Sequence, residues 1–486
     1  MKVILAAIFA ACILASCSVG PNYQQPEMEM PEGFQHMDTT MYVADTLHTL
    51  SDTTWWELFE DTVLTNLVRS ALDENVDVKI AAARVEQLMG QYGVEESEFW
   101  PKFDLGAGAD RGQYIAAPTN ADGVRVTSNR FQVNLSASWE IDLWGKVRRA
   151  SEAAEADLLA SEEARRGVVL STVSLIASSY FDLLSLDSQL EFTRRTAENR
   201  RVGLDLFRQR LGKGDLSELE YNQAEAEYWF AMAEIPRLEK SVTFLENTIS
   251  VLLGRNPGPI PRGKVLDSLK VPEIPLGLAS QILERRPDVR LAEEQLRSAN
   301  ARVGVAKSQY FPSISLTGLL GVVSGELSSL FSPASRAWNV GGSFLMPLFR
   351  SGEISGQVEL SEGVKKELVY NYVNTVHNAF RDAEDALTDR TKTWEQATAE
   401  EKRVAALSSY LRLASMRFNE GVTSYLEVLD ADRTLYTSQL SYVQTKAAVY
   451  KSIVGIYRAF AGGWLDIAAA ESFQVVEPIE IREKEE

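Results

Sequence analysis

An internal duplication places the strongest constraint on the fold. Residues 75–101 and 286–312 match without a gap at a spacing of 211 residues, the distance from Pro101 to Pro312. Self-similarity over such a length indicates one structural unit that occurs twice. We therefore expect two equivalent units in place of one continuous domain.

The duplication divides the chain into six expected segments. These are a signal peptide at 1–16, a lipid-anchored extended segment at 17–54, a first repeat at 55–260, a linker at 261–270, a second repeat at 271–464 and an acidic tail at 465–486. Prolines just before 261–270 favour a connection between units. In each repeat we expect a helix, a β-hairpin (102–143 or 312–349) and a long helical hairpin.

The predicted hairpins alternate strictly between apolar and polar residues. Phe131, Val133 and Leu135 share one face, and Gln132 and Asn134 lie on the other. Strands of ten or more residues with one apolar face are typical of a membrane β-barrel, although a soluble sandwich with one buried face has the same pattern. Four such strands behind an export signal favour the barrel.

Four strands cannot close a barrel, because bacterial barrels have even strand numbers from about eight upward. An open edge in lipid would leave backbone groups unpaired at a cost of several kcal/mol each. The chain must therefore oligomerise. Two, three or four copies would supply about eight, twelve or sixteen strands, and strand counting does not choose among them.

The remaining sequence predicts very long helices. No proline occurs from Gly145 to Leu211, and a helix of that length would extend roughly 100 Å. Apolar residues in it step by four and three, as at Val169, Val173 and Ile176, which is coiled-coil spacing. Pro236 predicts a kink or a break in the partner helix.

The N-terminus has the three parts of a bacterial lipoprotein signal. Lys2 is followed by an apolar run too short to span a bilayer, and small residues precede Cys17. The alternative is an ordinary signal peptide with a chance cysteine. Cleavage before Cys17 would leave it to carry the N-acyl and S-diacylglycerol lipid, and Ser18 after it favours delivery to the outer membrane. Because Cys12 would leave with the signal, the mature chain has no pair for a disulfide.

A helix–glycine–helix stretch occurs once in each repeat. Gly214 and Gly421 occupy matching sites, where a left-handed backbone conformation is easiest for glycine. In the second copy Ser424 is placed to cap the following helix. Glu427 and Asp430 lie three apart and share a face of that helix.

Composition and motifs exclude several functions. The formal net charge of −19 disfavours nucleic-acid binding, which needs clustered Lys and Arg. The three histidines are scattered, and we find neither a metal-ligand pair nor a phosphate-loop or nucleophile-elbow motif. We expect no enzyme activity, no metal site and no cofactor beyond the covalent lipid.

The distinctive pieces follow one another in a recognisable order. They are 17–23 after the signal, 55–61 with its paired tryptophans, 139–145 at the end of the first hairpin, Pro312 at a strand entry, 417–431 around Gly421, and 459–464. Together they resemble the outer-membrane efflux proteins of the TolC family, in particular the lipoprotein branch typified by OprM. The resemblance covers essentially the whole mature chain.

That resemblance implies a mixed fold and a transport function. Three chains would close a twelve-stranded β-barrel in the outer membrane, continued into the periplasm by a barrel of long helices. Such a homotrimer is a passive exit duct for small molecules and drugs. It is driven by an inner-membrane pump of the resistance-nodulation-division type through a periplasmic adaptor (membrane fusion) protein.

The resemblance also assigns two groups of residues. A pore gate at the periplasmic mouth would be formed by Leu426, Glu427, Asp430 and Arg433. An adaptor-docking rim would comprise Arg210, Leu211, Gly214, Ser217, Arg417, Phe418, Gly421 and Ser424. The plainer interpretation is that the two acids form a solvated helix face and that the glycines only end helices.

Two other functions remain open. Within transport, the first alternative is a duct for type I protein secretion or for metal efflux. The second alternative, from a different class of protein, is a periplasmic coiled-coil adaptor or structural lipoprotein. The alternating strands argue against it.

Overall fold

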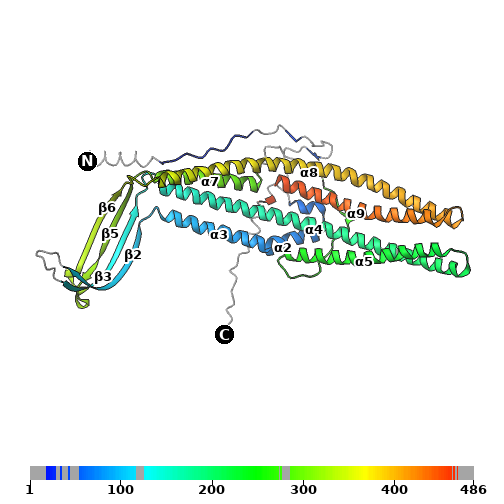
Figure 1. Cartoon of the computed structure of the whole chain (residues 1–486), viewed down its shortest axis with the longest axis horizontal. Helices are drawn as coiled ribbons and strands as arrows, with labels where there is room; N and C mark the ends of the chain where they lie inside the picture. The colour runs from blue at the N-terminus through cyan, green and yellow to red at the C-terminus, as the bar shows by residue number, and fades with distance from the viewer. Residues whose placement is uncertain are drawn as a thin grey trace. The chain divides into compact units, whose positions relative to one another are not determined.

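The computed structural model describes residues 18–28, 33–34, 42–43, 54–115, 125–272, 274–275, 285–461, 464–465 and 468 (Figure 1). The predicted signal peptide, Cys17, the tip of the first hairpin at 116–124 and most of the segments 17–54 and 465–486 lie outside these residues.

The elements follow the order that the duplication predicts. The first half contains β1 (Tyr42–Val43), η1 (Trp55–Phe59), α2 (Thr62–Glu74), α3 (Val76–Ser97), β2 (Lys102–Ile115), β3 (Arg125–Glu140), α4 (Lys146–Lys213) and α5 (Glu218–Leu252). The second contains η2 (Leu266–Ser268), β4 (Ile274–Pro275), α7 (Pro287–Ser308), β5 (Ser313–Ser324), η3 (Leu327–Ser329), η4 (Pro333–Ser335), β6 (Arg336–Leu345), α8 (Glu353–Asn419) and α9 (Tyr425–Phe460).

Contacts in space divide the chain into two compact units, and each takes segments from both predicted repeats. The first unit comprises Met1–Glu27, Val85–Ser161 and Ala292–Tyr372, and the second comprises the remaining segments. The repeats are defined by sequence and the units by contacts, so the repeat boundaries stay a prediction.

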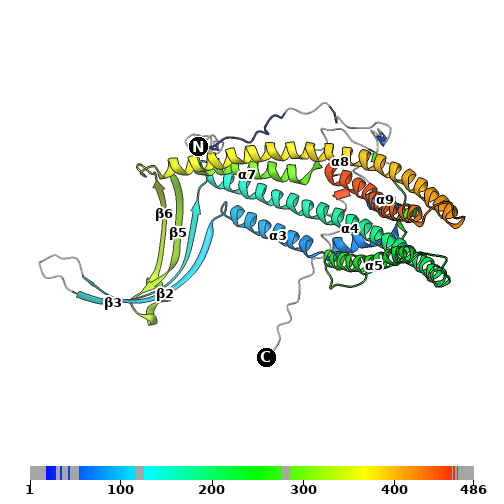
Figure 2. The same ribbon diagram turned by 45° about the vertical axis from the view of Figure 1, so that its right-hand side comes forward.

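The first unit contains the predicted pair of hairpins as one antiparallel sheet. Its strand order is β2-β3-β5-β6, so β2 and β6 are the edges (Figure 2). The register aligns Leu105, Leu135, Leu320 and Trp338 in one row across all four strands. The neighbouring row, Asp104, Ser136, Leu319 and Asn339, belongs to the other face.

The apolar face of this sheet is exposed. Leu105 and Trp338, at the two ends of the apolar row, expose 78% and 76% of their surface. A soluble sandwich would bury such a row, whereas a membrane barrel turns it toward lipid. The exposure therefore fits the barrel and not the sandwich.

The length predicted for the helix after Gly145 is confirmed, and the second repeat contains a helix of nearly the same length. α4 has 68 residues and α8 has 67. In the described part of the chain, α4 also contains an 18-residue stretch apolar enough to cross a membrane by length and composition. Since 61% of that stretch is buried, it has the character of a core helix.

Of the two outcomes predicted for Pro236, a kink or a break, the break is wrong. α5 runs from Glu218 to Leu252 with Pro236 inside it. Proline removes one backbone hydrogen bond but leaves the rest of the helix free to continue. Packing of neighbouring residues such as Leu238, which is buried, helps to hold the helix together.

The core of the second unit is a cluster of aromatic side chains. Trp55 stacks on Tyr457 at 5.3 Å between ring centroids, and Trp56 meets Trp464 edge to face at 5.6 Å. Phe59 of the same 3-10 helix packs against Phe181 of α4 at 5.0 Å. Aromatic pairs of this kind contribute about 0.5–1.5 kcal/mol each beyond area burial.

The predicted linker is packed against this core. The Tyr180 hydroxyl donates to Asp61 Oδ2 at 2.8 Å and accepts from the Gly263 N–H at 3.0 Å. Asp61 Oδ2 also accepts from the Lys264 N–H at 3.1 Å, and a Cβ on Gly263 would lie 2.1 Å from Asp61 Oδ1. The start of the linker is therefore fixed to α2 and α4.

Two buried tyrosines provide a test of this arrangement. Tyr180→Phe should lower the free energy of unfolding by about 1–3 kcal/mol, because it leaves Asp61 and the Gly263 N–H short of a partner. Tyr457 has an equally buried hydroxyl without a partner in the described structure, so Tyr457→Phe should be neutral or stabilising. Thermal unfolding of the purified variants measures both, and equal effects would contradict the assignment.

Candidate functional site at the helical turns

The two glycine turns have the same backbone hydrogen bonds. In the first, Gly214 N donates to Leu211 O and Asp215 N donates to Arg210 O, both at 3.0 Å. In the second, Gly421 N donates to Phe418 O at 3.0 Å and Val422 N donates to Arg417 O at 2.9 Å. The sequence match between the turns is therefore also a match of conformation.

Both glycines adopt the left-handed conformation that the sequence predicted. Their φ angles are +84° at Gly214 and +72° at Gly421. A Cβ at either position would meet nothing within 4 Å. Glycine is therefore needed for backbone conformation and not for space, and the surface around each turn is open in this chain.

The helix caps after the turns differ, and one expectation is wrong. Ser217 forms a capping box with Glu220, accepting from its N–H at 3.3 Å while Glu220 Oε2 accepts from the Ser217 N–H at 3.0 Å. Ser424 occupies the N-cap position of α9, but its side chain makes no capping bond. The Thr423 hydroxyl donates to Glu427 Oε2, so the hydrogen bond at this turn lies one residue earlier.

A small aromatic cluster joins the turns. Phe207 of α4 meets Tyr425 of α9 edge to face at 4.7 Å, and Phe418 lies 5.5 Å from the same ring. Buried Leu204 and Ala224 complete the cluster. Burial raises the pKa of Tyr425 to about 12. Phe418, predicted as a docking residue, is thus half-buried and packs against the other turn.

A network of four charged side chains, of which Arg200 and Glu227 are buried, connects the helices close to the turns. Arg200 of α4 pairs with Asp432 of α9 at 2.6 Å and with Glu227 of α5 at 3.2 Å. Only 7% of the Arg200 side chain and 9% of the Glu227 side chain are exposed. Arg433 Nε donates to Glu227 Oε1 at 2.6 Å, so two arginines share this carboxylate. The network ties α9 to the α4–α5 hairpin.

The structure separates the four predicted gate residues by environment. Leu426 is 60% exposed, and Asp430 is exposed on the same helix. Glu427 is half-buried and accepts the bond from Thr423. Arg433 was expected to offset Asp430 or to pair across chains, but here it pairs with Glu227 of its own chain.

The eight predicted rim residues all lie at the two turns. Arg417, Gly421, Ser424, Gly214 and Ser217 are exposed. Arg210, Leu211 and Phe418 are half-buried. Only the five exposed residues could contact a partner protein without a change in this chain's packing.

The charge network was missed by sequence reasoning. Arg200 and Glu227 lie on different helices, and neither has a charged counterpart in the second copy, where Leu407 and Thr434 stand at the matching sites. The one available signal was that both positions carry a charge in the first copy and none in the second.

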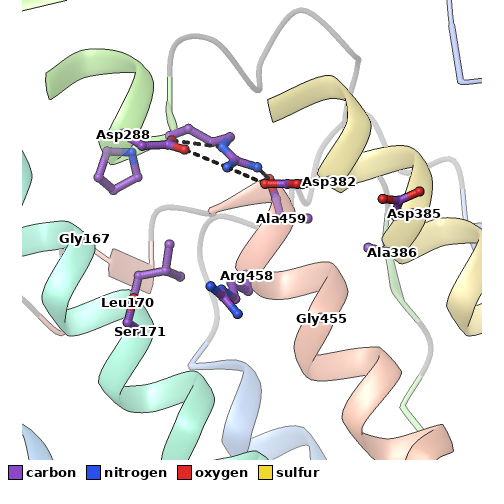
Figure 3. A pocket seen from close by; sticks show the side chains of 12 residues that line it. Gly167, Leu170, Ser171, Asp288, Asp382, Asp385, Ala386, Gly455, Arg458 and Ala459 are labelled. Carbon is purple, nitrogen blue, oxygen red and sulfur yellow. Dashed lines mark hydrogen bonds and ion pairs between the residues drawn. The ribbon is translucent and has the colours of Figure 1, made fainter. Parts of the chain in front are cut away.

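A pocket of about 460 Å³ elsewhere in the second unit has a structural charge cluster at its wall. Figure 3 shows Asp288 and Asp382 joined to one guanidinium, that of Arg286, which also donates to Ala459 O at 3.0 Å. Burial raises the pKa of the Asp382 carboxyl, but bonds from Arg381 and Arg286 outweigh this and lower it overall. The cluster holds the start of α7 against α8 and α9.

The described residues contain no group of three His, Cys, Asp or Glu side chains placed to hold a metal ion. Among these residues, the turns provide exposed carboxylates and exposed apolar side chains. They also lie next to the charge network of Arg200, Glu227, Asp432 and Arg433, which we call the ionic lock.

The lock can be tested by breaking one partner. Glu227→Ala should lower the free energy of unfolding by about 3–5 kcal/mol, because it leaves a buried arginine without one of its carboxylates. The matched control is Glu198→Ala, which removes a surface partner of Arg201 and should change stability by about 0–1 kcal/mol. Denaturant unfolding of both variants compares them, and equal effects would show that the buried network does not hold the turns together.

Comparisons with known proteins agree with this architecture. The family model described as outer membrane efflux protein matches residues 67–255 and 278–462. The chain is 31% identical to the cation efflux system protein CusC of Escherichia coli K12, over 93% of this chain and 98% of that protein. It is 32% identical to the solvent efflux pump outer membrane protein SrpC of Pseudomonas putida, over 94% and 97%.

A solved structure shows the same fold. The outer-membrane channel OprN superposes with a TM-score of 0.85 at 28% identity, covering 92% of this chain and all of that one. The expected combination of β-strands with long helices, closed only by several chains, is confirmed by this likeness. The chain belongs to the outer membrane efflux protein family and is the outer-membrane channel of an efflux system.

Proposed function

We propose that the protein is a homotrimeric, passive exit duct for small molecules, coupled through a periplasmic adaptor to an inner-membrane pump of the resistance-nodulation-division type. The observation that carries this is one sheet with an exposed apolar face, connected to helices of 68 and 67 residues. The strands would span the membrane, and the helices would continue the channel into the periplasm.

Three copies are the stoichiometry that we propose. The edges β2 and β6 need partners in lipid, and strand β6 of one copy beside β2 of the next pairs them all. Three chains of four strands make about twelve, an even number within the range of bacterial barrels. Lipid on Cys17 would anchor each chain in the same membrane.

We propose that Asp430 and Leu426 form the pore gate. A threefold axis through the turns would bring three copies of each side chain together, so that the carboxylates attract cations and the leucines narrow the pore. Both side chains are exposed in one chain and so are available for such a ring. Glu427 would contribute from a half-buried position, and Arg433 would act by holding α9 to α5.

We propose that the exposed part of the two turns is the surface that meets the adaptor. Gly214 and Gly421 leave open space around them, and exposed Arg417 and Ser217 flank them. Two turns of equal conformation in each chain would present six similar knobs in a trimer.

The substrate class has two candidates. Solvent efflux by SrpC supports small organic molecules, and cation efflux by CusC supports metal ions. We propose small organic molecules, which the description of SrpC supports, and keep metal ions as the alternative. The same duct would export cations if its adaptor and pump belonged to a cation efflux system.

Deletion and complementation test the proposed function. Loss of the gene should increase sensitivity to dyes, detergents and antibiotics, and the plasmid-borne gene should restore resistance. Copper and silver tolerance measured in the same strains identifies the alternative. Unchanged resistance to all of these compounds would contradict the small-molecule proposal.

Conductance tests the gate. Asp430→Ala with Arg433→Ala should raise the resting single-channel conductance in planar bilayers, because it removes both a ring of carboxylates and a tie to α5. Block by multivalent cations from the periplasmic side should disappear in Asp430→Ala. Asp432→Ala is the control that loosens the lock but leaves the carboxylate ring, so it should keep the cation block. Unchanged conductance and block in Asp430→Ala would remove this residue from the gate.

Bulky substitutions test the rim. Gly421→Trp should impair efflux while trimers and barrel insertion persist, because the side chain would project into open surface where the adaptor is proposed to dock. Gly421→Ala imposes the strain of a left-handed backbone conformation, about 1–2 kcal/mol, with little bulk and serves as the control. Loss of trimers in both variants would show that the glycine only ends a helix.

A further inference from the structure

The segment that follows the predicted lipidation site is docked in the first unit. Val19 N donates to Trp144 O at 3.0 Å, and Asn300 Nδ2 donates to Pro21 O at 2.9 Å. Arg149 Nη2 donates to Asn22 Oδ1 at 2.7 Å. These bonds connect Val19, Pro21 and Asn22 to the turn before α4, to α7 and to α4. We call residues 18–27 the anchor strap.

The strap continues along α7 and ends at α8. The Arg297 guanidinium lies over the Tyr23 ring at 4.9 Å, and the Tyr23 hydroxyl donates to Glu293 Oε1 at 3.3 Å. Gln25 Nε2 donates to the hydroxyl of Tyr372 at 3.0 Å, and Tyr372 is buried. The strap is therefore bound at several points between Val19 and Gln25 and is not a free tether.

A notch of glycines admits the strap. A Cβ on Gly304 would lie 2.9 Å from Val19 O, and a Cβ on Gly20 would lie 2.5 Å from Gly304 Cα. Gly20 also has a φ of +108°. A Cβ on Gly145 would lie 2.8 Å from Ser18 Oγ. At these positions the two backbones are too close for any side chain.

The duplication shows that the notch is specific. Gly93 of α3 is the repeat counterpart of Gly304, and a Cβ there would meet nothing within 4 Å. Asn300 is 1% exposed, whereas its counterpart Met89 is 53% exposed. The strap groove is thus built in only one of two equivalent places, because the chain has only one N-terminus.

The notch lies where the two hairpins meet. Trp144, which accepts the bond from Val19, donates its indole N–H to Pro312 O at 2.7 Å and stacks on Phe311 at 4.9 Å. Ile141 N donates to Ile314 O at 2.9 Å beside it. These contacts join the end of β3 to the start of β5, at the base of the sheet.

We propose that the anchor strap is a built-in ligand of the glycine notch, and that its docking holds the lipid-bearing N-terminus at the base of the four-stranded sheet. This rests on the proposed lipidation of Cys17. Only one peptide unit, about 3.8 Å long, separates Cys17 from Ser18. The acyl chains would therefore begin beside Gly145, where the strands pass into the helices.

A docked strap does what a flexible one cannot. A free ten-residue linker would let the lipid wander to a root-mean-square distance of about 17 Å. Docking instead keeps the lipid at one height on the protein, which would align the membrane surface with the strand bases. The lipid would also reach the membrane already attached to the junction of the hairpins.

Alanine at the two equivalent glycines tests the docking. Gly→Ala inside a helix normally stabilises it, by about 0.5–1 kcal/mol. Gly93→Ala should therefore leave the strap unchanged. Gly304→Ala should displace it, and hydrogen–deuterium exchange of the peptide covering 18–28 should become at least about tenfold faster, as expected for overpacking a close contact.

A second pair of variants removes a bond without adding bulk. Asn300→Ala should also accelerate exchange in 18–28, whereas Met89→Ala should not. Both pairs are measured on the full-length protein purified from the outer membrane. Protection of the strap in Gly304→Ala and Asn300→Ala equal to that in Gly93→Ala and Met89→Ala would overturn the proposal.

Lipidation is measured separately, so that the two proposals can fail independently. Palmitate labelling of the wild type tests Cys17. A version exported by a non-lipoprotein signal peptide with Cys17→Ser should carry no label and still protect residues 18–28. With lipid attached, Gly304→Ala should yield fewer heat-modifiable oligomers in the outer membrane than Gly93→Ala. Equal yields would show that docking does not assist insertion.

Discussion

Strands β2 and β6 are the edges of a four-stranded sheet whose apolar face is exposed. In a membrane such edges must find partners, since no water is present to satisfy backbone N–H and C=O groups. This requirement makes the single chain incomplete. The exposed row from Leu105 to Trp338 fits the same environment, because a membrane barrel turns its apolar face toward lipid.

The second organising feature is the use of a duplication for unequal purposes. Gly214 and Gly421 form turns with the same hydrogen bonds, but the charges behind them differ, and Arg200 and Glu227 have no charged equivalents. Gly93 and Gly304 also match in sequence, yet only Gly304 receives the strap. Two copies of one unit thus provide a regular scaffold, in which a few residues of one copy form the charge network and the backbone at Gly304 alone meets the strap.

Both asymmetric features act on connections between elements. The ionic lock joins α9 to the α4–α5 hairpin near the turns. Trp144 and the strap join the hairpins at the base of the sheet.

Most of the fold was predictable because its signals are local. Alternation with period two identified all four strands, and the absence of proline identified the length of α4. The turn glycines were predictable because a left-handed residue strongly favours glycine. The errors concern competition between local options: Thr423 rather than Ser424 makes the side-chain bond at the second turn, and α5 continues through Pro236.

The sequence by itself determined the order of the elements, the apolar face of each strand, the two turns and the need for several chains, because periodicity and backbone chemistry act over a few residues. Only the tertiary structure decided which side chains meet. Arg433 pairs with Glu227 across 206 positions of the chain, and Gly20 touches Gly304, because these contacts depend on how distant helices and segments pack. Such contacts leave no periodic trace in the sequence.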